Sequence, residues 1–336
     1  MRPGPEDMPI QGGRLLTRAQ YRILDAAETI LQEPKVSDQD RAFIARQVVQ
    51  VTLPHADPGD VPVWKRSNGY LTLSIRPGWD HDRNCQRGYP YGTLPRLLLF
   101  WMTTEAVRTG SRRLELGATL ASFMRELGLD PGRGGKRSDA YRLREQMQRL
   151  FRSTISFEHS QQDGQKLGKK WLDMQVAPQG ELWWDPVSPE QPALWGSWIE
   201  LGEAFHDAIV ASPVPVDLRA LRALKKSPLA LDLYAWATYK TFSVSRSGKE
   251  GQPIPWRSLQ KQLGCDYANP RHFKAAAKVA IRKVQVVYPG FRVAEYVDNY
   301  GGGLVVKRGT TAVPGGRSLE QSSPTNRFRP PTTLKR

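Results

Sequence analysis

Residues 132–154, GRGGKRSDAYRLREQMQRLFRST, place glycines, a lysine and a serine at the start of a long basic segment. A nucleotide-binding P-loop consists of Gly, four residues and then Gly-Lys-Ser/Thr, so that backbone amides wrap the phosphates. In this chain Asp130 occupies the first glycine position of that motif, and Arg137 follows Lys136 where Ser or Thr is needed. Residues 118–129 are patterned as a helix and not as the buried strand that precedes a P-loop. The stretch therefore predicts the start of a basic helix and not a nucleotide-binding loop.

The segment from 138 to 152 has the periodicity of an amphipathic helix. One face is apolar and is expected to be buried; it consists of Ala140, Leu143, Met147, Leu150 and Phe151. The opposite face is polar and mostly basic; it consists of Ser138, Arg142, Glu145, Arg149 and Arg152, with Tyr141 and Gln148 beside it. Ser138 is expected to be the N-cap, which would direct the amides of Gly134 and Gly135 toward an anion.

The same order of elements is predicted twice along the chain. In the first copy, a helix from 93 to 108 is followed by a short strand, a helix that ends at Leu-Gly (127–128) and the basic helix. In the second copy, a helix from 228 to 242, with Ser227 as its N-cap, is followed by a short helix that ends at Leu-Gly (263–264) and by another basic helix. Sequence identity between the copies is low, so the repeat is one of pattern only.

Two strand-like segments around a polar loop follow each basic helix, at 153–176 and at 291–309. Helix, short helix, basic helix and hairpin is the order of a winged helix-turn-helix. We therefore predict an α+β protein with two tandem winged helix-turn-helix domains, a small N-terminal extension and a disordered basic C-terminal tail. The expected boundaries are 1–87 for the extension, 88–212 and 213–309 for the two winged-helix domains, and 310–336 for the tail.

The N-terminal extension is expected to contain helices near 18–32 and 38–51, the second opened by a capping Ser or Asp. Residues 61–76 alternate apolar and polar side chains around an Asn-Gly pair, which predicts a β-hairpin. The tail is rich in Pro, Gly, Ser and Thr, and it has too little apolar material to fold alone.

The second basic helix begins after Asn269, and no acidic residue occurs from there to Arg292. Its apolar face consists of Phe273, Ala276, Ala277, Ala280 and Val284. Its other face consists of Arg271, Lys274, Lys278, Arg282 and Gln285. An ordinary solvated helix face is the alternative, but such faces usually mix charges of both signs. Four cations without an acidic partner on the helix favour phosphate as their counter-charge.

The two basic helices together supply the candidate DNA-binding residues. These are Gly134, Gly135, Lys136, Arg137, Ser138, Tyr141, Arg142, Arg149 and Arg152 of the first helix and its approach, and Asn269, Arg271, Lys274, Lys278, Arg282 and Gln285 of the second. Arg, Gln and Asn side chains could contact base edges as well as phosphates, and the sequence does not assign either role to a given residue.

The composition restricts the class of partner. The formal net charge is +16, yet residues 1–60 carry 7 Lys or Arg and 9 Asp or Glu, so the positive charge is concentrated in the rest of the chain. Segments with this excess of positive charge favour a polyanion as the binding partner, above all nucleic acid. The longest apolar run, 97–102, is too short to span a membrane, and residues 1–30 contain no apolar signal core. We therefore expect a cytoplasmic, DNA-associated bacterial protein.

Features of an enzyme or a metal centre are not apparent in the sequence. Cys85 and Cys265 are the two cysteines, and the five histidines are isolated, which predicts loop or surface positions without metal-ligand spacing. Nicking initiators need a histidine pair for a metal and a tyrosine nucleophile, and no such pair occurs. Packing contacts are the expected role of six aromatic residues, with base stacking as the alternative: Trp183, Trp184, Trp195, Trp198, Tyr234 and Trp236. We therefore expect no enzymatic activity, no cofactor and no metal.

Several stretches between residue 88 and about residue 290 occur in one characteristic order: GYPYGTLPRLLLFWMTTEAVRTGSRRLELG, FMRELGL, LREQMQRLF, LDLYAWATY and IPWRSLQKQLG. In this order they resemble the RepA-type plasmid replication initiators, which are similar to other iteron-binding initiators with tandem winged helices. The resemblance implies a protein that binds direct repeats (iterons) in a plasmid origin and promotes opening of the adjacent AT-rich DNA.

The resemblance also implies partners: the host replicative helicase, the host initiator ATPase, and a second copy of the chain in dimers that repress their own promoter and so control copy number. A sequence-specific winged-helix repressor without origin-melting activity is the alternative, because it would use the same two modules.

Overall fold

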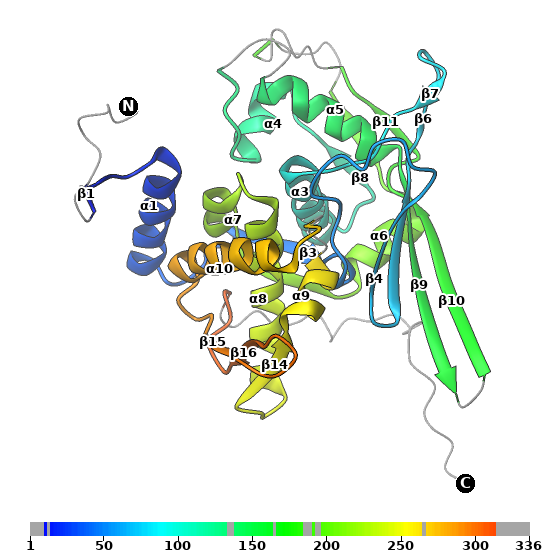
Figure 1. Cartoon of the computed structure of the whole chain (residues 1–336). Helices are drawn as coiled ribbons and strands as arrows, with labels where there is room; N and C mark the ends of the chain where they lie inside the picture. Colours follow the sequence, from blue (N-terminus) through cyan, green and yellow to red (C-terminus); the bar gives the residue numbers. More distant parts are fainter. Residues whose placement is uncertain are drawn as a thin grey trace.

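The computed structural model describes residues 10–11, 14–132, 138–163, 166–183, 190–191, 196–263 and 267–313 (Figure 1). Helices and strands are mixed along these residues, and their buried apolar side chains form a continuous hydrophobic core cluster. No helix among the described residues is both long enough and apolar enough to cross a membrane. Of the predicted tail, residues 314–336 lie outside the described residues.

The first predicted set of elements is present in the predicted order. Its members are α3 (Thr93–Thr109), β8 (Arg113–Glu115), α4 (Leu120–Glu126), α5 (Asp139–Phe151), β9 (Thr154–Asp163) and β10 (Lys166–Gln175). Gly110 ends α3 with a φ of 66°, a left-handed conformation that favours glycine. The buried face of α5 is the predicted one, because Leu143, Met147 and Leu150 are fully enclosed.

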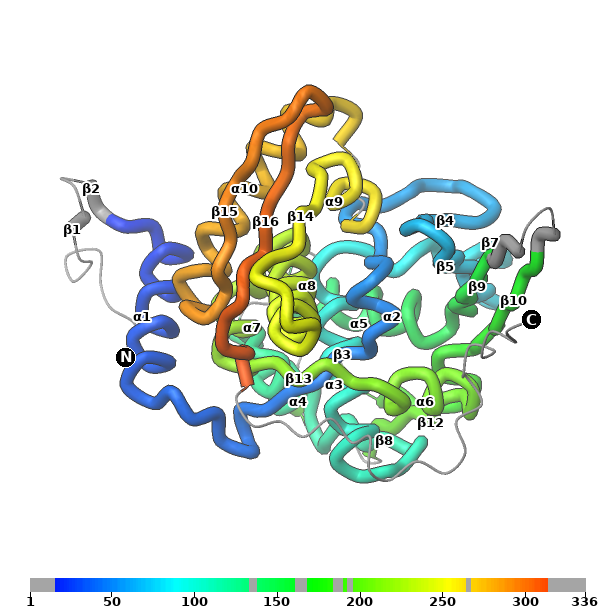
Figure 2. The backbone as a smooth tube through the Cα atoms, turned by 90° about the horizontal axis from the view of Figure 1, so that it is seen from below, coloured from blue at the N-terminus to red at the C-terminus, as the bar shows by residue number. Residues whose placement is uncertain are grey.

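The second predicted set is also present in the predicted order, with one strand between its first two helices that was not predicted. Its members are α8 (Pro228–Arg246), β14 (Gly251–Pro255), α9 (Trp256–Leu263), α10 (Pro270–Val287), β15 (Val293–Tyr296) and β16 (Gly303–Lys307). Ser227 caps α8, and its side chain accepts from the Ala230 N–H. The three strands pair in the order β14-β16-β15, as Figure 2 shows. Phe273, Ala277 and Val284 of α10 are buried, as its periodicity predicts.

The predicted helix at 38–51 is wrong in its first half. The segment forms strand β3 (Arg41–Ala45) and then the short helix α2 (Arg46–Gln50). Strand β3 pairs antiparallel with β13 (Pro213–Asp217), with which it lies side by side in Figure 2. This pairing supplies hydrogen bonds and buries Ala42 and Ile44, and it overrides the local helical pattern. The helix predicted at 18–32 is confirmed as α1 (Arg18–Gln32), with a capping box at its start.

The predicted hairpin is confirmed as β4 (Trp64–Asn68) and β5 (Leu71–Arg76). It joins the long hairpin of β9 and β10, and the four strands have the order β10-β9-β5-β4. Leu73 faces Phe157 across β5 and β9, and both side chains are buried. The N-terminal hairpin therefore widens the sheet that follows α5.

Smaller elements complete the described chain. They are β1 (Ile10–Gln11), β2 (Arg14–Leu15), β6 (Trp79–Asp80), β7 (Cys85–Gln86), β11 (Gln179–Glu181), β12 (Trp198–Glu200), α6 (Glu203–Val210) and α7 (Leu218–Leu224). Strand β12 lies between β11 and β8. Strand β3 pairs with β13 and strand β5 pairs with β9, so the N-terminal segment contributes strands to two sheets that it shares with later parts of the chain. The domain boundaries at 87, 212 and 309 stay predictions.

A buried ion pair ties α3 to α8. The Arg96 guanidinium donates from Nε to Asp232 Oδ1 at 2.7 Å and from Nη2 to Oδ2 at 2.8 Å. The carbonyls of Leu53, Pro54 and Gly92 accept its other N–H groups. The His55 Nε2 lies 2.7 Å from Asp232 Oδ2. The Arg96–Asp232–His55 cluster thus joins three distant parts of the chain. His55 lies in a loop, as predicted, but its side chain is largely buried, which the sequence did not predict.

This cluster makes stability depend on pH. Burial and the Arg96 charge lower the pKa of His55 from its ordinary value of 6.5. Between the lowered value and 6.5 the unfolded chain binds a proton that the folded protein does not. We therefore expect the free energy of unfolding to fall as the pH drops below 6.5, with a contribution from His55 of up to about 1.4 kcal/mol per pH unit.

Denaturant unfolding at ~pH 7.5 and ~pH 5.5 measures this dependence. His55→Gln is the comparison, because glutamine keeps an N–H donor for Asp232 and does not titrate. A variant that loses as much stability as the wild type over this range would contradict the assignment to His55.

Candidate nucleic-acid interface

The start of α5 is organised by its cap. The Ser138 hydroxyl accepts from the Tyr141 N–H at 3.1 Å, and Ser138 is buried. This confirms the predicted N-cap and places the Ser138 side chain in the helix start, away from solvent. The Tyr141 side chain is exposed. The predicted residues Gly134, Gly135, Lys136 and Arg137 lie outside the described residues.

The predicted arginines of α5 differ in exposure. Arg142 is 61% exposed and forms an ion pair with Asp139 on the same helix. Arg149 is only 18% exposed; it pairs with Asp57 at 3.0 Å and with Glu145 at 3.1 Å. Arg152 is exposed at the C-cap of α5.

Arg149 is therefore part of a local network. Its Nη1 also donates to the Tyr89 carbonyl, and its guanidinium lies 5.4 Å from the centre of the Tyr91 ring. Burial acts to lower the pKa of Arg149, but the hydrogen bonds to Asp57 and Glu145 outweigh it and raise the pKa above its ordinary value. Helix periodicity places Glu145 on the same face as Arg149, whereas it could not predict the second carboxylate partner, Asp57.

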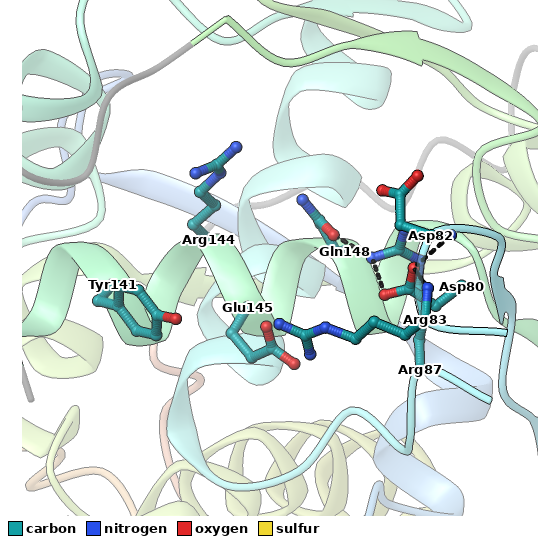
Figure 3. A pocket seen from close by; sticks show the side chains of 8 residues that line it. All are labelled: Asp80, Asp82, Arg83, Arg87, Tyr141, Arg144, Glu145 and Gln148. Atoms are coloured by element: carbon teal, nitrogen blue, oxygen red, sulfur yellow. Dashed lines mark hydrogen bonds and ion pairs between the residues drawn. The ribbon is translucent and has the colours of Figure 1, made fainter. Parts of the chain in front are cut away.

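The turn between β6 and β7 lies against the exposed face of α5 and leaves an open cleft of about 240 Å³ (Figure 3). The Arg87 guanidinium lies between Gln148 of α5, to which it donates, and Asp80, with which it pairs at 3.2 Å. Asp80 Oδ1 also accepts the backbone N–H groups of Asp82 and Arg83, which holds the turn. The turn therefore covers part of the C-terminal half of α5.

Two exposed arginines at this cleft, Arg83 and Arg144, are absent from the residues predicted by sequence. Arg144 lies one turn after the exposed Tyr141 on the same helix, and this spacing could have identified it. Arg83 lies far from α5 in the sequence, and only the fold brings it to the helix.

The start of α10 is organised by a cap that was not predicted from the sequence. The Asn269 side chain accepts from the Arg271 N–H at 2.9 Å and is the N-cap. Arg271 and Arg282 are exposed, and Gln285 is half-buried. Arg271 and Arg282 thus lie on the solvent side of a helix whose other face is packed into the core.

The two predicted lysines of α10 have a partner that sequence analysis missed. Lys274 Nζ lies 2.9 Å from Glu295 Oε1, and Lys278 Nζ lies 2.6 Å from Glu295 Oε2. The helix itself contains no acid, as expected, but strand β15 brings this carboxylate back to it. The inference that the four-cation face lacks an internal partner is therefore wrong for both lysines. Spacing on the helix could not identify Glu295, because the contact depends on how the hairpin folds back.

The predicted packing role of the aromatic residues is confirmed for Tyr234 and Trp236, which are fully buried. Trp183, by contrast, is 55% exposed. Trp184 and Trp195 lie outside the described residues. Among the described residues no group of three or more His, Cys, Asp or Glu side chains is placed to hold a metal ion.

Comparison with known proteins gives a family match that covers the first predicted set of elements and extends into the second. The profile of the family described as plasmid encoded RepA protein matches residues 89–258, which is half of the chain. No curated protein sequence matches the chain.

Two solved structures of domains 2 and 3 of RctB are similar to this structure. One has a TM-score of 0.42 and 10% identity, and the match covers 78% of this chain and 96% of that chain. The other, a selenomethionine derivative, has a TM-score of 0.46 and 12% identity, and the match covers 81% of this chain and 99% of that chain.

Proposed function

Because this chain belongs to the family of plasmid encoded RepA proteins, which are replication initiators, we propose that it binds direct repeats in a plasmid origin through two winged-helix modules. The observation that carries the proposal is the doubled arrangement of a short helix, a basic helix and a hairpin. In each copy the basic helix packs one face into the core and leaves cationic side chains on the other.

Each proposed module combines a helix-turn-helix with a wing. In the first, α4 and α5 are the two helices of the motif, and β9 and β10 form the wing. In the second, α9 and α10 are the helices, and β15 and β16 form the wing. The second helix of such a motif is the one that enters the major groove. This makes α5 and α10 the proposed recognition helices.

The exposed cations have the chemistry that duplex DNA requires. Arg142 and Arg152 of α5, and Arg271 and Arg282 of α10, can reach phosphates, which supply most of the affinity and its salt dependence. An arginine can also form two hydrogen bonds with guanine in the major groove. Arg149 is held by Asp57 and Glu145, so we assign it a smaller share of the DNA contacts than Arg142.

Family membership also supports the further steps. We propose that binding to the iterons promotes opening of adjacent AT-rich DNA, that the protein then recruits the host helicase and initiator ATPase, and that a dimeric form represses its own promoter. We propose that it does so without enzymatic activity of its own, in the bacterial cytoplasm. A repressor with the same two modules would bind its operator and leave an origin closed.

Footprinting and an unwinding assay on the origin of the plasmid that encodes the chain separate these functions. We expect protection of an array of direct repeats, followed by permanganate-reactive thymines in the AT-rich segment. Protection of a single inverted repeat without unwinding would favour the repressor. Incubation of the protein with supercoiled origin DNA and a divalent metal is expected to leave the DNA uncut. A nick would contradict the proposal that the protein has no enzymatic activity.

The two modules predict a specific footprint. Two recognition helices in one chain should occupy successive major grooves on one side of the DNA, with centres about 10–10.5 bp apart. Hydroxyl-radical footprinting of a single iteron measures this spacing. A protected region that spans one groove only would contradict the use of both helices by one chain.

A further inference from the structure

Glu295 lies on strand β15 of the proposed wing of the second module and contacts the proposed recognition helix α10. Its two carboxylate oxygens each bind one lysine of α10, Lys274 at 2.9 Å and Lys278 at 2.6 Å. Lys274 is further held at 5.5 Å from the centre of the Trp256 ring. One strand residue therefore pairs with two of the four cations predicted to contact DNA, and its single negative charge offsets part of their positive charge.

The charge on Glu295 is secure at neutral pH. The hydrogen bonds from Lys278 and Lys274 lower the pKa of Glu295 below its ordinary value. Both contacts are charge-assisted hydrogen bonds between a carboxylate and a lysine. A DNA phosphate that approaches this part of α10 must therefore replace the carboxylate as the partner of each lysine.

The exposure of the three side chains makes this exchange feasible. Lys274 is 33% exposed, Lys278 is 40% exposed and Glu295 is 35% exposed. Ion pairs at such positions are screened by solvent and contribute little to stability. Arg149 of the first module contrasts with them, because it is 18% exposed and also bonded to a backbone carbonyl.

We propose that Glu295 is a specificity-determining residue that competes with DNA phosphates for Lys274 and Lys278, and thereby weakens binding to non-specific duplex DNA. The inference rests on the proposed function, since it requires α10 to contact DNA. Non-specific binding depends almost entirely on phosphate contacts. The pairing of Lys274 and Lys278 with Glu295 therefore opposes the main source of non-specific affinity. At a cognate site, contacts to base edges add affinity that Glu295 does not oppose.

Glu295→Gln tests this directly, because glutamine keeps the size of the side chain and removes its charge. We expect the affinity for a random-sequence duplex to rise roughly tenfold at low salt, since two more cations become free to bind phosphates. The dependence of log K on log salt concentration should become steeper by up to about two units. Affinity for the cognate repeat should rise less, so the ratio of specific to non-specific affinity should fall.

Glu250→Gln is the matched control. It removes the same charge from the same module, but Glu250 precedes β14, at the sheet edge opposite β15. We expect its effect on non-specific affinity to be clearly smaller than that of Glu295→Gln. Equal effects of the two variants would overturn the proposal, because they would show an effect of net charge alone.

A double variant, Lys274→Ala with Lys278→Ala, separates failure of this proposal from failure of the proposed function. If α10 binds DNA, the double variant has a shallower salt dependence than the wild type. If the double variant weakens DNA binding but Glu295→Gln leaves non-specific affinity unchanged, only the proposed role of Glu295 is wrong, and the contact of α10 with DNA stands. If the double variant leaves DNA binding unchanged, the two lysines do not contact DNA and the inference is wrong. The four-alanine variant that also replaces Arg271 and Arg282 then tests whether α10 contacts DNA.

Discussion

Asp232→Ala is expected to lower the free energy of unfolding by about 3–5 kcal/mol, because it leaves the Arg96 guanidinium buried without its carboxylate. Arg96 is 3% exposed, and Asp232 accepts two of its hydrogen bonds. Burial alone would raise the pKa of Asp232, but the Arg96 charge and the His55 hydrogen bond outweigh it and lower the pKa to about 2. The carboxylate is therefore ionised in the folded protein at neutral pH, and it balances the buried arginine.

Urea unfolding at neutral pH measures this effect. Asp173→Ala is the matched control, because Asp173 pairs with Arg76 at 3.4 Å at an exposed position, where both side chains are more than half exposed. We expect the control to cost less than about 1 kcal/mol. If the two variants lose the same stability, the Arg96–Asp232 pair does not stabilise the contact between α3 and α8 in the way we describe.

Alanine at Arg271, Lys274, Lys278 and Arg282 together is expected to weaken binding to origin DNA by roughly 100-fold or more at physiological salt, because it removes every predicted cationic contact of α10. Each phosphate interaction that the substitutions remove should make the salt dependence of log K shallower by about one unit. If one of the arginines binds guanine through two hydrogen bonds, its replacement should cost roughly 1–3 kcal/mol and relax the preference at one base pair. The free energy of unfolding should change little, since these side chains lie away from the core.

Titrations of origin DNA at several salt concentrations, together with thermal unfolding, check this prediction. Two variants serve as controls. Arg112→Ala with Arg113→Ala removes two cations near β8, outside both proposed recognition helices, and should leave DNA binding nearly unchanged. Phe273→Ala empties a fully buried position of α10 and should weaken the fold first. A four-alanine variant with wild-type affinity and salt dependence would favour the ordinary solvated-face interpretation of α10.

The elements predicted correctly are those whose signals are local. The periodicity of residues 138–152 identified the buried face of α5, and Ser138 and Ser227 were identified as caps because capping involves residues within one turn. The hairpin of β4 and β5 was predicted from its Asn-Gly turn, where Gly69 has a φ of 61°. In each case the interaction that determines the structure is formed by residues close together in the chain.

The features that the sequence did not predict have the opposite cause. Residues 41–45 form a strand because β13, which lies far away in sequence, supplies its hydrogen-bond partners. His55 is largely buried because α3 and α8 bring Arg96 and Asp232 to it. In both cases a contact with a distant segment contributes more than the local preference.

The amino-acid sequence by itself determined the order of helices and hairpins, the buried and cationic faces of α5 and α10, and the resemblance to an initiator family. Only the tertiary structure decided which of those cations have internal partners: Asp57 holds Arg149, and Glu295 holds both lysines of α10. The reason is physical. Helical periodicity is a local property of the backbone, whereas an ion pair depends on the distance between charges, which the folding of remote segments sets.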